Sequence, residues 1–289
     1  MLESSISRRA MLARCALMLF PSIGRGETRP GAPLVQINAL EAASHARIGL
    51  AAIDTGSGRT ILHRESERFL FCSTWKFLVV AALLARVDKG EENLGRTVHF
   101  LKSDLVPYAP VTGRHLENGM TVAALCEAAI TVSDNAAANL LLMAVGGFAG
   151  LNGFIRSLGD KMTALNRNEP AVNIPDGDED TTTPQAMMGD MKTILLGNVL
   201  KPGSRKKLLD WLIANTTGGS MLRAGMPANW TVGDKTGHGD NAANDIAIVM
   251  PPGRKPILIA AYSMHHSGTT APAPILGAIG KIVAATFAS

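Results

Sequence analysis

The sequence has few cysteines, and this bounds the covalent cross-links that it can form. Three occur among 289 residues. Cys15 falls in an N-terminal segment that we expect to be removed, which leaves Cys72 and Cys126 in the mature protein. These two could form one disulfide, but nothing in the sequence requires it.

An excess of charge of one sign is also missing. The 28 basic and 24 acidic residues leave a formal net charge of only +4, with a sequence pI of about 9.1. Because Lys and Arg are scattered among acids and are not massed on one stripe, binding to nucleic acid is poorly supported. A hydrophobic content of 46% and a mean hydropathy of +0.15 indicate a compact globular protein.

The N-terminal apolar stretch is too short to act as a membrane anchor. It ends at Phe20, is interrupted by Arg14, and cannot cross a bilayer of roughly 30 Å. Such a stretch after basic residues is typical of an export signal. Ser7-Arg8-Arg9 followed by Met11-Leu12 resembles a twin-arginine signal, although the Sec route remains open.

We therefore expect a signal peptide over residues 1–28, with a mature start between Gly24 and Ala32. Arg14 directly before Cys15 disfavours cleavage as a lipoprotein, so we expect no stable membrane anchor. The protein would then be exported and periplasmic, or secreted if the host lacks an outer membrane. The alternative is an amphipathic first helix that stays in the fold.

Hydrophobic periodicity divides the chain into an early hairpin, a helical middle block and late strands followed by a helix. The turn of the hairpin is the segment Asp54-Thr55-Gly56-Ser57-Gly58. We expect strands at 47–53, 60–63, 230–234, 245–250 and 257–262, and helices at 37–46, 74–87, 122–131, 135–145, 183–196 and 274–287.

Strands at both chain ends that bracket a helical block favour an α/β fold with one antiparallel sheet built from both ends. We expect residues 29–66 and 215–289 to form the α/β lobe and residues 67–214 an all-α lobe. A cleft between two such lobes is a favoured ligand site.

Ser73 and Lys76 are three residues apart at the start of a predicted helix, so both lie on one face near its N-terminus. A serine hydroxyl becomes a useful nucleophile when a nearby base takes its proton, and a partly desolvated lysine has a lowered pKa. Free N–H groups at the helix start could also stabilise an oxyanion. Alone, this spacing is more typical of a helix cap followed by a surface lysine.

Two further short segments carry polar groups where the predicted elements meet. Ser133-Asp134-Asn135 lies between two helical runs, where a helix cap is the simplest role. Lys235-Thr236-Gly237 follows a predicted strand, and Gly237 with Gly239 would let a ligand approach the strand backbone. The simpler interpretation of this segment is an edge strand with a solvated lysine.

Taken in order, Ser-x-x-Lys, Ser-Asp-Asn and Lys-Thr-Gly are the three-motif set of class A β-lactamases and penicillin-binding proteins, and the chain resembles the class A β-lactamases. The resemblance covers essentially the whole mature chain. It implies a two-lobed fold with a five-stranded antiparallel sheet, flanked by helices, and an all-α lobe. It also implies hydrolysis of penicillins and cephalosporins through a serine acyl-enzyme, conferring resistance, without a metal or organic cofactor.

Glu169 and Asn173 separate the hydrolases from their penicillin-binding relatives. The pair matches the residues that hold the deacylating water in class A enzymes. Without such a base the acyl-enzyme would persist, whereas with it the ester is hydrolysed. A solvated loop glutamate is the alternative.

The resemblance implies a role for each motif residue. Ser73 is the nucleophile, Lys76 a proton acceptor in acylation, Ser133 the relay that protonates the lactam nitrogen, and Glu169 the deacylation base. The backbone N–H groups of Ser73 and His238 would form the oxyanion hole. The substrate-binding residues would be Tyr108, Asn135, Asn173, Lys235, Thr236, Gly237 and His238. Whether Lys76 or Glu169 is the acylation base stays open at this point.

The sequence departs from the family pattern at the carboxylate-binding arginine. Ala242-Ala243-Asn244-Asp245 occupies its strand position, Met221 an alternative site, and residues 271–274 contain no basic side chain. We hypothesise that His238, or His265 with His266, partly substitutes for it.

Other departures affect the loop and the cysteines. The loop from Arg167 to Asp180 is about two residues shorter than the resemblance leads us to expect. Its acidic stretch, residues 176–180, is expected to be a solvated loop, and His265-His266 a surface turn, with no metal bound. Gly239 stands where some carbapenem-hydrolysing members place a cysteine partner for Cys72, so we expect that bridge to be absent.

Two rival functions remain: a penicillin-binding peptidase or esterase, and a β-lactam sensor that stays acylated. Glu169 argues against the first, and the expected lack of a tether against the second. We expect a monomer whose only partner is a small β-lactam substrate, since no long exposed apolar element suggests a protein partner.

Overall fold

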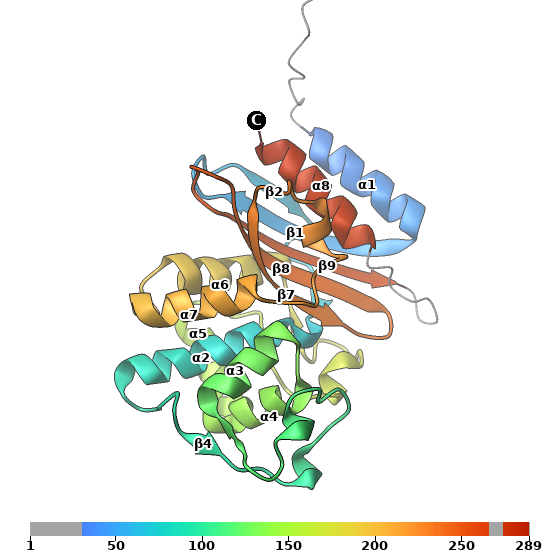
Figure 1. Cartoon of the computed structure of the whole chain (residues 1–289). Helices are drawn as coiled ribbons and strands as arrows, with labels where there is room; N and C mark the ends of the chain where they lie inside the picture. Colours follow the sequence, from blue (N-terminus) through green and yellow to red (C-terminus); the bar gives the residue numbers. More distant parts are fainter. Residues whose placement is uncertain (1–30, 266–273, 289) are drawn as a thin grey trace, which may run out of the picture. The chain divides into compact units, whose positions relative to one another are not determined.

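Strands from the N-terminal and C-terminal parts of the chain form one antiparallel sheet, in the order β2-β1-β9-β8-β7 (Figure 1). The computed structural model describes residues 31–265 and 274–288. The strands are β1 (Ala46–Asp54), β2 (Thr60–His63), β7 (Thr231–His238), β8 (Ala242–Met250) and β9 (Ile257–His265). The predicted hairpin and late strands are confirmed, and the five-stranded sheet agrees with the expected α/β class. β7 runs farther than predicted, so the segment 235–237 belongs to the strand itself.

The sheet is covered on both faces, which explains the apolar run in β9. Side chains alternate across a strand, so Ile257, Ile259 and Ala261 join one core while Leu258 and Tyr262 join the other. Helices α1 and α8 pack over the first face, and α6 and α7 over the second (Figure 1). These helices are α1 (Ala32–Ser44), α6 (Pro184–Leu196), α7 (Pro202–Ile213) and α8 (Pro274–Phe287).

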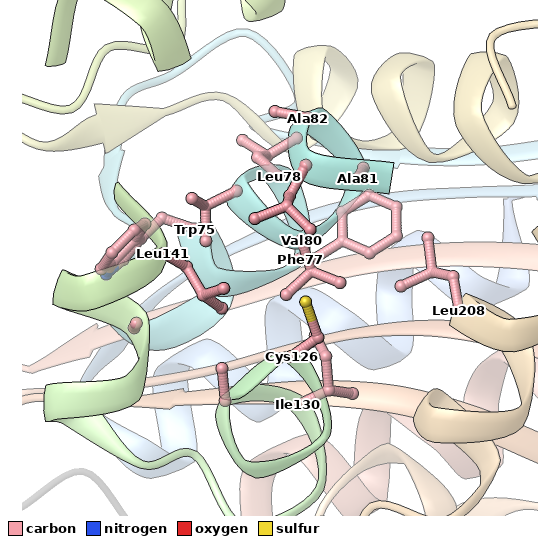
Figure 2. Close-up of a cluster of buried hydrophobic side chains, with 14 of the residues drawn as sticks. Trp75, Phe77, Leu78, Val80, Ala81, Ala82, Cys126, Ile130, Leu141 and Leu208 are labelled. Carbon is pink, nitrogen blue, oxygen red and sulfur yellow. The ribbon is translucent and has the colours of Figure 1, made fainter. Parts of the chain in front are cut away.

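Helix α2 (Trp75–Lys89) is the buried centre of the helical region. Its side chains from Trp75 to Ala85 are all buried. A helix that is apolar all round has to be surrounded by other elements. In Figure 2, Trp75, Phe77 and Val80 lie among side chains of neighbouring helices. Those neighbours include Cys126 and Ile130 of α3 (Val122–Thr131), Leu141 of α4 (Asn135–Ala144) and Leu208 of α7.

The sequence predicted α2, α3, α4, α6 and α8 to within two residues at either end. It did not single out α5 (Gly147–Ser157) or α7 inside the helical block. Both begin with segments that weaken a helical pattern, Gly146-Gly147 in one case and Pro202-Gly203 in the other.

Two short antiparallel strand pairs hold loops of the helical region in place. β3 (Phe69–Leu70) pairs with β6 (Thr181–Thr182), and β4 (Thr97–Val98) pairs with β5 (Met120–Thr121). The first ladder holds the end of one long loop beside the segment that leads to Ser73. Gly31–Ser289 clusters as one compact unit, and the lobe boundaries expected at 66/67 and 214/215 stay a prediction.

The two cysteines of the described residues, Cys72 and Cys126, are free and buried, as small apolar side chains would be. The predicted signal peptide with Cys15 lies outside the described residues. Within the described ranges, no single helix has the length and apolarity to cross a membrane. Helices α4 and α5 reach that length and apolarity only when they are taken together, and the chain bends by 79° between them.

Candidate active site

Ser73 lies on a sharp turn between β3 and the central helix. It is in a short 3-10 helix, Cys72–Thr74, and α2 follows at Trp75. Cys72 has a φ of 47°, a left-handed conformation that is uncommon for a residue with a side chain. The turn therefore presents the Ser73 hydroxyl at the N-terminus of a rigid, buried helix.

Lys76 is one helical turn from Ser73, and its side chain is 0% exposed. Its Nζ donates to the Ser133 carbonyl at 2.9 Å and to Asn135 Oδ1 at 2.5 Å, and lies 3.0 Å from Glu169 Oε1. Burial lowers the pKa of Lys76, although the Glu169 carboxylate acts in the opposite direction. The amine is thus desolvated, and it shares Glu169 Oε1 with the Ser73 hydroxyl.

In the segment Ser133-Asp134-Asn135, Asp134 has a structural role, whereas Ser133 and Asn135 contact Lys76. Asp134 caps α4 by accepting from the Ala137 N–H at 2.9 Å, which is the simple role that the sequence suggested. Ser133 has a φ of 60° and turns its carbonyl and hydroxyl toward Lys76. Asn135 donates to the Pro107 carbonyl at 2.9 Å, which ties the start of α4 to the Tyr108 segment.

β7 is the edge strand of the sheet and passes directly beside Ser73. Lys235 is fully buried and donates to Ser133 Oγ at 3.0 Å, so the solvated lysine of the simpler interpretation is wrong. Burial, together with the charge of Lys76, lowers the pKa of Lys235 to about 7. Gly237 allows close approach of the protein's own backbone, because a Cβ there would lie 2.9 Å from Phe71 O and 3.2 Å from Ser73 N.

Glu169 is only 1% exposed, so the alternative of a solvated loop glutamate is wrong. Its Oε1 accepts from Ser73 Oγ at 2.9 Å and from Trp75 Nε1 at 3.3 Å, and its Oε2 accepts from Asn173 Nδ2 at 2.6 Å. Burial alone would raise the pKa of Glu169. The charge of Lys76 and these hydrogen bonds outweigh burial and bring the pKa below its ordinary value.

Asn139 holds the backbone of Glu169, and the sequence analysis missed it. Its side-chain amide donates to the Glu169 carbonyl and accepts from the Glu169 N–H, both at 3.0 Å. Asn139 is four residues after Asn135 on α4, so the two amides lie on one face of that helix. A second asparagine at this spacing within an Ala- and Leu-rich helix was the signal that could have found it.

The loop that carries Glu169 is closed at its neck by charge. Arg167 Nε lies 2.5 Å from Asp180 Oδ2, and Asp180 Oδ1 accepts from the N–H groups of Asn166 and Arg167. This ion pair joins the two ends of the loop. Asp180 is buried in this arrangement, whereas Asp176 and Asp178 are exposed, so the expected solvated loop is wrong for Asp180.

These residues surround a cavity of about 380 Å³. The side chains that line it are Ser73, Tyr108, Ser133, Asn135, Asn173, Thr217, Thr236 and His238. Thr217 was not predicted, and its hydroxyl lies 2.5 Å from that of Thr236. Lys76, Glu169, Lys235 and Gly237 are not part of this lining, but each lies next to Ser73 or Ser133, which are. The structure thus brings the predicted site residues into one place.

The lining residues that the structure describes include no arginine. Arg223 pairs instead with the buried Asp234, and Asn244 donates to the Leu70 carbonyl at 2.8 Å. His238 lines the cavity. His265 is buried on β9 and outside that lining, so the expected surface turn is wrong for it, while His266 lies outside the described residues. Among the described residues, no group of three or more acidic, His or Cys side chains is arranged to hold a metal ion.

A nucleophilic serine at the N-terminus of a buried helix, a lysine and a glutamate in contact, and an edge strand alongside define a serine hydrolase of the β-lactamase type. Comparison with known proteins agrees. A family model described as the Beta-lactamase enzyme family matches residues 34–287.

The chain is 46% identical over 266 residues to β-lactamase AST-1 of Nocardia asteroides, covering 88% of this chain and 86% of that relative. It is 39% identical to β-lactamase CTX-M-97 of Escherichia coli, covering 99% and 100%. The solved structure of the last common ancestor of Gram-negative bacterial class A β-lactamases (GNCA4) matches with a TM-score of 0.86 at 52% identity. That match covers 89% of this chain and 99% of the ancestor.

The chain therefore belongs to the β-lactamase enzyme family. It is a class A serine β-lactamase, a hydrolase of β-lactams.

Proposed function

We propose that this chain hydrolyses penicillins and cephalosporins through an acyl-enzyme on Ser73, and that this activity confers β-lactam resistance. The observation that carries the proposal is the contact of one buried carboxylate with both partners of the chemistry. Glu169 Oε1 lies 2.9 Å from Ser73 Oγ and 3.0 Å from Lys76 Nζ.

In acylation, Ser73 Oγ forms a bond to the lactam carbonyl carbon and the C–N bond of the ring breaks. The Ser73 proton leaves through the Glu169–Lys76 pair, whose shared contacts keep the carboxylate ionised and the amine desolvated. Ser133 Oγ, 3.3 Å from Lys76 Nζ and 3.0 Å from Lys235 Nζ, gives its proton to the departing nitrogen and regains one from these lysines.

In deacylation, Glu169 takes a proton from a water molecule, whose oxygen attacks the ester carbon. The ester C–O bond breaks, and Ser73 Oγ recovers the proton. Asn173 bonds the other oxygen of Glu169 and Asn139 fixes its backbone, so the carboxylate is held in one orientation. This base is the reason to prefer a hydrolase over a sensor that stays acylated.

Substrate binding is distributed over the cavity wall. The N–H groups of Ser73 and His238 form the oxyanion hole, and Gly237 permits the close approach of β7 to Ser73 that this hole requires. Asn135 and Asn173 bind the side-chain amide of the substrate, Lys235 and Thr236 its carboxylate, and Tyr108 borders the entrance.

His238 partly substitutes for the absent arginine. Strand alternation places it on the same face of β7 as Thr236, where both line the cavity. Burial and the charge of Lys235 lower the pKa of His238, so its imidazole is a neutral N–H donor at pH 7 and a cation only in acid.

The remaining features of the proposal concern the context of the enzyme. It acts in the periplasm, or outside the cell if the host lacks an outer membrane, after removal of residues 1–28. It works as a monomer, without a membrane anchor, nucleic-acid partner, metal or organic cofactor.

The test is intact-mass spectrometry over time with excess benzylpenicillin, for wild type and Glu169→Gln. We expect wild type to turn substrate over without a lasting adduct, and the variant to accumulate one acyl group on Ser73. Ser73→Ala is the matched control and should form no adduct. A wild type that stays acylated would replace the hydrolase proposal with the sensor or penicillin-binding function.

A further inference from the structure

A second cavity, of about 490 Å³, lies away from Ser73 and shares no lining residue with its pocket. Helix α6 and the loop after α5 form its walls. The wall includes the apolar side chains of Leu158, Met162 and Ala186 and the carboxyl groups of Asp160 and Asp190.

Asp190 is buried in this wall without a donor for one of its oxygens. Its side chain is on α6 and is 2% exposed. Among the described residues, no donor reaches Asp190 Oδ2. A buried carboxyl oxygen without a donor is costly and is rarely left so in a folded protein.

The neighbour of Asp190 is another acid. Asp160 already accepts from the N–H groups of Met162, at 2.6 Å, and Thr163, at 3.1 Å. Burial, then the charge and hydrogen bond of Asp160, raise the pKa of Asp190 to about 9, so Asp190 holds a proton at neutral pH. The charge of Asp160 thus lies beside a protonated carboxyl in the wall of a partly apolar cavity.

The charged groups near Asp160 and Asp190 leave the negative charge of these acids accessible to a ligand. Arg156 of α5 donates to the backbone carbonyls of Asp160 and Thr163, and only moderates the pKa of Asp190. Lys161 is an exposed side chain at the cavity rim. On the sheet side, the phenol of Tyr262 is buried, and its pKa is raised by burial and by the two acids.

We propose that this cavity binds a small organic cation with a flat apolar body, of the aryl amidinium class, whose N–H groups donate to Asp190 and Asp160. Planar N–H donors match a pair of carboxylates in both charge and geometry. The apolar part lies against Leu158, Met162 and Ala186. As the cation enters, Asp190 loses its proton to solvent, and no bond in the ligand changes.

The probe is benzamidine, and the matched control ligand is benzamide, which has the same shape without the charge. Calorimetric titration of the wild type at pH 7, in two buffers of different ionisation enthalpy, measures both the affinity and the protons released. We expect benzamidine to bind with release of up to about one proton. We expect benzamide to bind at least about tenfold more weakly.

Two variants test the site by different means. Asp190→Asn removes the acid that ionises when the cation binds, and Gly189→Leu places a side chain where a Cβ meets no atom within 4 Å, which fills the cavity and keeps both acids. Each should weaken benzamidine binding at least about tenfold, whereas the exposed Asp210→Asn on α7 should not. Penicillin hydrolysis by both variants verifies that they are folded. Absence of binding by wild type, equal binding of benzamide, or full affinity in both variants would overturn the proposal.

Discussion

Glu169 and Asp190 are both almost inaccessible to solvent, yet their carboxyl groups have opposite acidities. The pKa of Glu169 is below its ordinary value, and that of Asp190 is raised to about 9. Burial favours the neutral form of both groups. The difference comes from their neighbours, which are Lys76, Ser73 and Asn173 for Glu169 but a second acid, Asp160, for Asp190.

This contrast teaches what a buried acid needs in order to act as a base at neutral pH. Glu169 has donors on both oxygens and a cation in contact, so it is ionised and can accept a proton. Asp190 holds a proton and cannot do so. Burial without a cation gives a neutral acid, which offers a binding site for a cation but no general base.

Removing Lys76 should have the largest effect on the difference between Glu169 and Asp190, because Glu169 would then also be buried without a cation. We expect Lys76→Met to lower kcat/KM by about 10²–10⁴-fold and to cost about 3–5 kcal/mol of unfolding free energy. Steady-state kinetics and denaturant unfolding measure the two effects. The double variant with Glu169→Gln should be more stable than Lys76→Met alone, and equal stability would contradict the pairing.

Neutralising Asp190 should stabilise the protein. Because its folded-state pKa is raised, the stability due to this group is full below its ordinary value of 3.8 and is lost as the pH rises toward about 9. Asp190→Asn avoids that loss, and its amide can donate to Asp160. We expect a gain of about 2–4 kcal/mol at pH 7 that disappears near pH 4, measured by denaturant unfolding at each pH. A gain that did not depend on pH would contradict a proton held by Asp190 at pH 7.

Removing the backbone clamp should weaken Glu169 without changing its charge. We expect Asn139→Ala to slow deacylation about tenfold or more, because a small displacement of a catalytic group is costly. Burst and steady-state kinetics with a chromogenic cephalosporin separate deacylation from acylation. Asn152→Ala, which removes a comparable side-chain clamp on the Leu165 backbone, is the control. An equal loss in both variants would mean that Asn139 acts only through stability.

The smallest expected effect concerns His238. Its lowered pKa means that it becomes cationic only in acid, so its contribution to carboxylate binding should grow as the pH falls through that pKa. We expect the KM of His238→Ser for benzylpenicillin to exceed that of wild type by about threefold or more near pH 5, and by less at pH 8. A KM ratio that is constant between these pH values would rule out the proposed substitution for arginine.

The sequence allowed much of this arrangement to be predicted because the motifs lie at the ends of recognisable elements. The hairpin, the late strands and most helices followed from periodicity, and the order of the three motifs indicated the family. Contacts across the fold did not follow. Asn139 could have faced solvent from α4, and Asp190, within Met188-Gly189-Asp190-Met191, resembles an ordinary polar helix position.

Tertiary packing decided the residues that were placed wrongly. Asp180 is buried because it receives the loop backbone and Arg167, and His265 because β9 continues beyond the predicted strand. Residue 237 is glycine because β7 passes close to the backbone at Ser73. These two segments are more than 160 residues apart in the sequence. Local patterns carry no information about such neighbours.

The most direct test of the central contrast is a ¹³C NMR titration of protein labelled at the side-chain carboxyl carbons of Asp and Glu. Glu169→Gln and Asp190→Asn identify the two signals. We predict that the Glu169 carboxyl stays ionised from neutral pH to below its ordinary pKa of 4.5, and that Asp190 stays protonated at pH 7 and titrates near pH 9. A protonated Glu169 at pH 7, or an Asp190 that titrates near 3.8, would contradict the account.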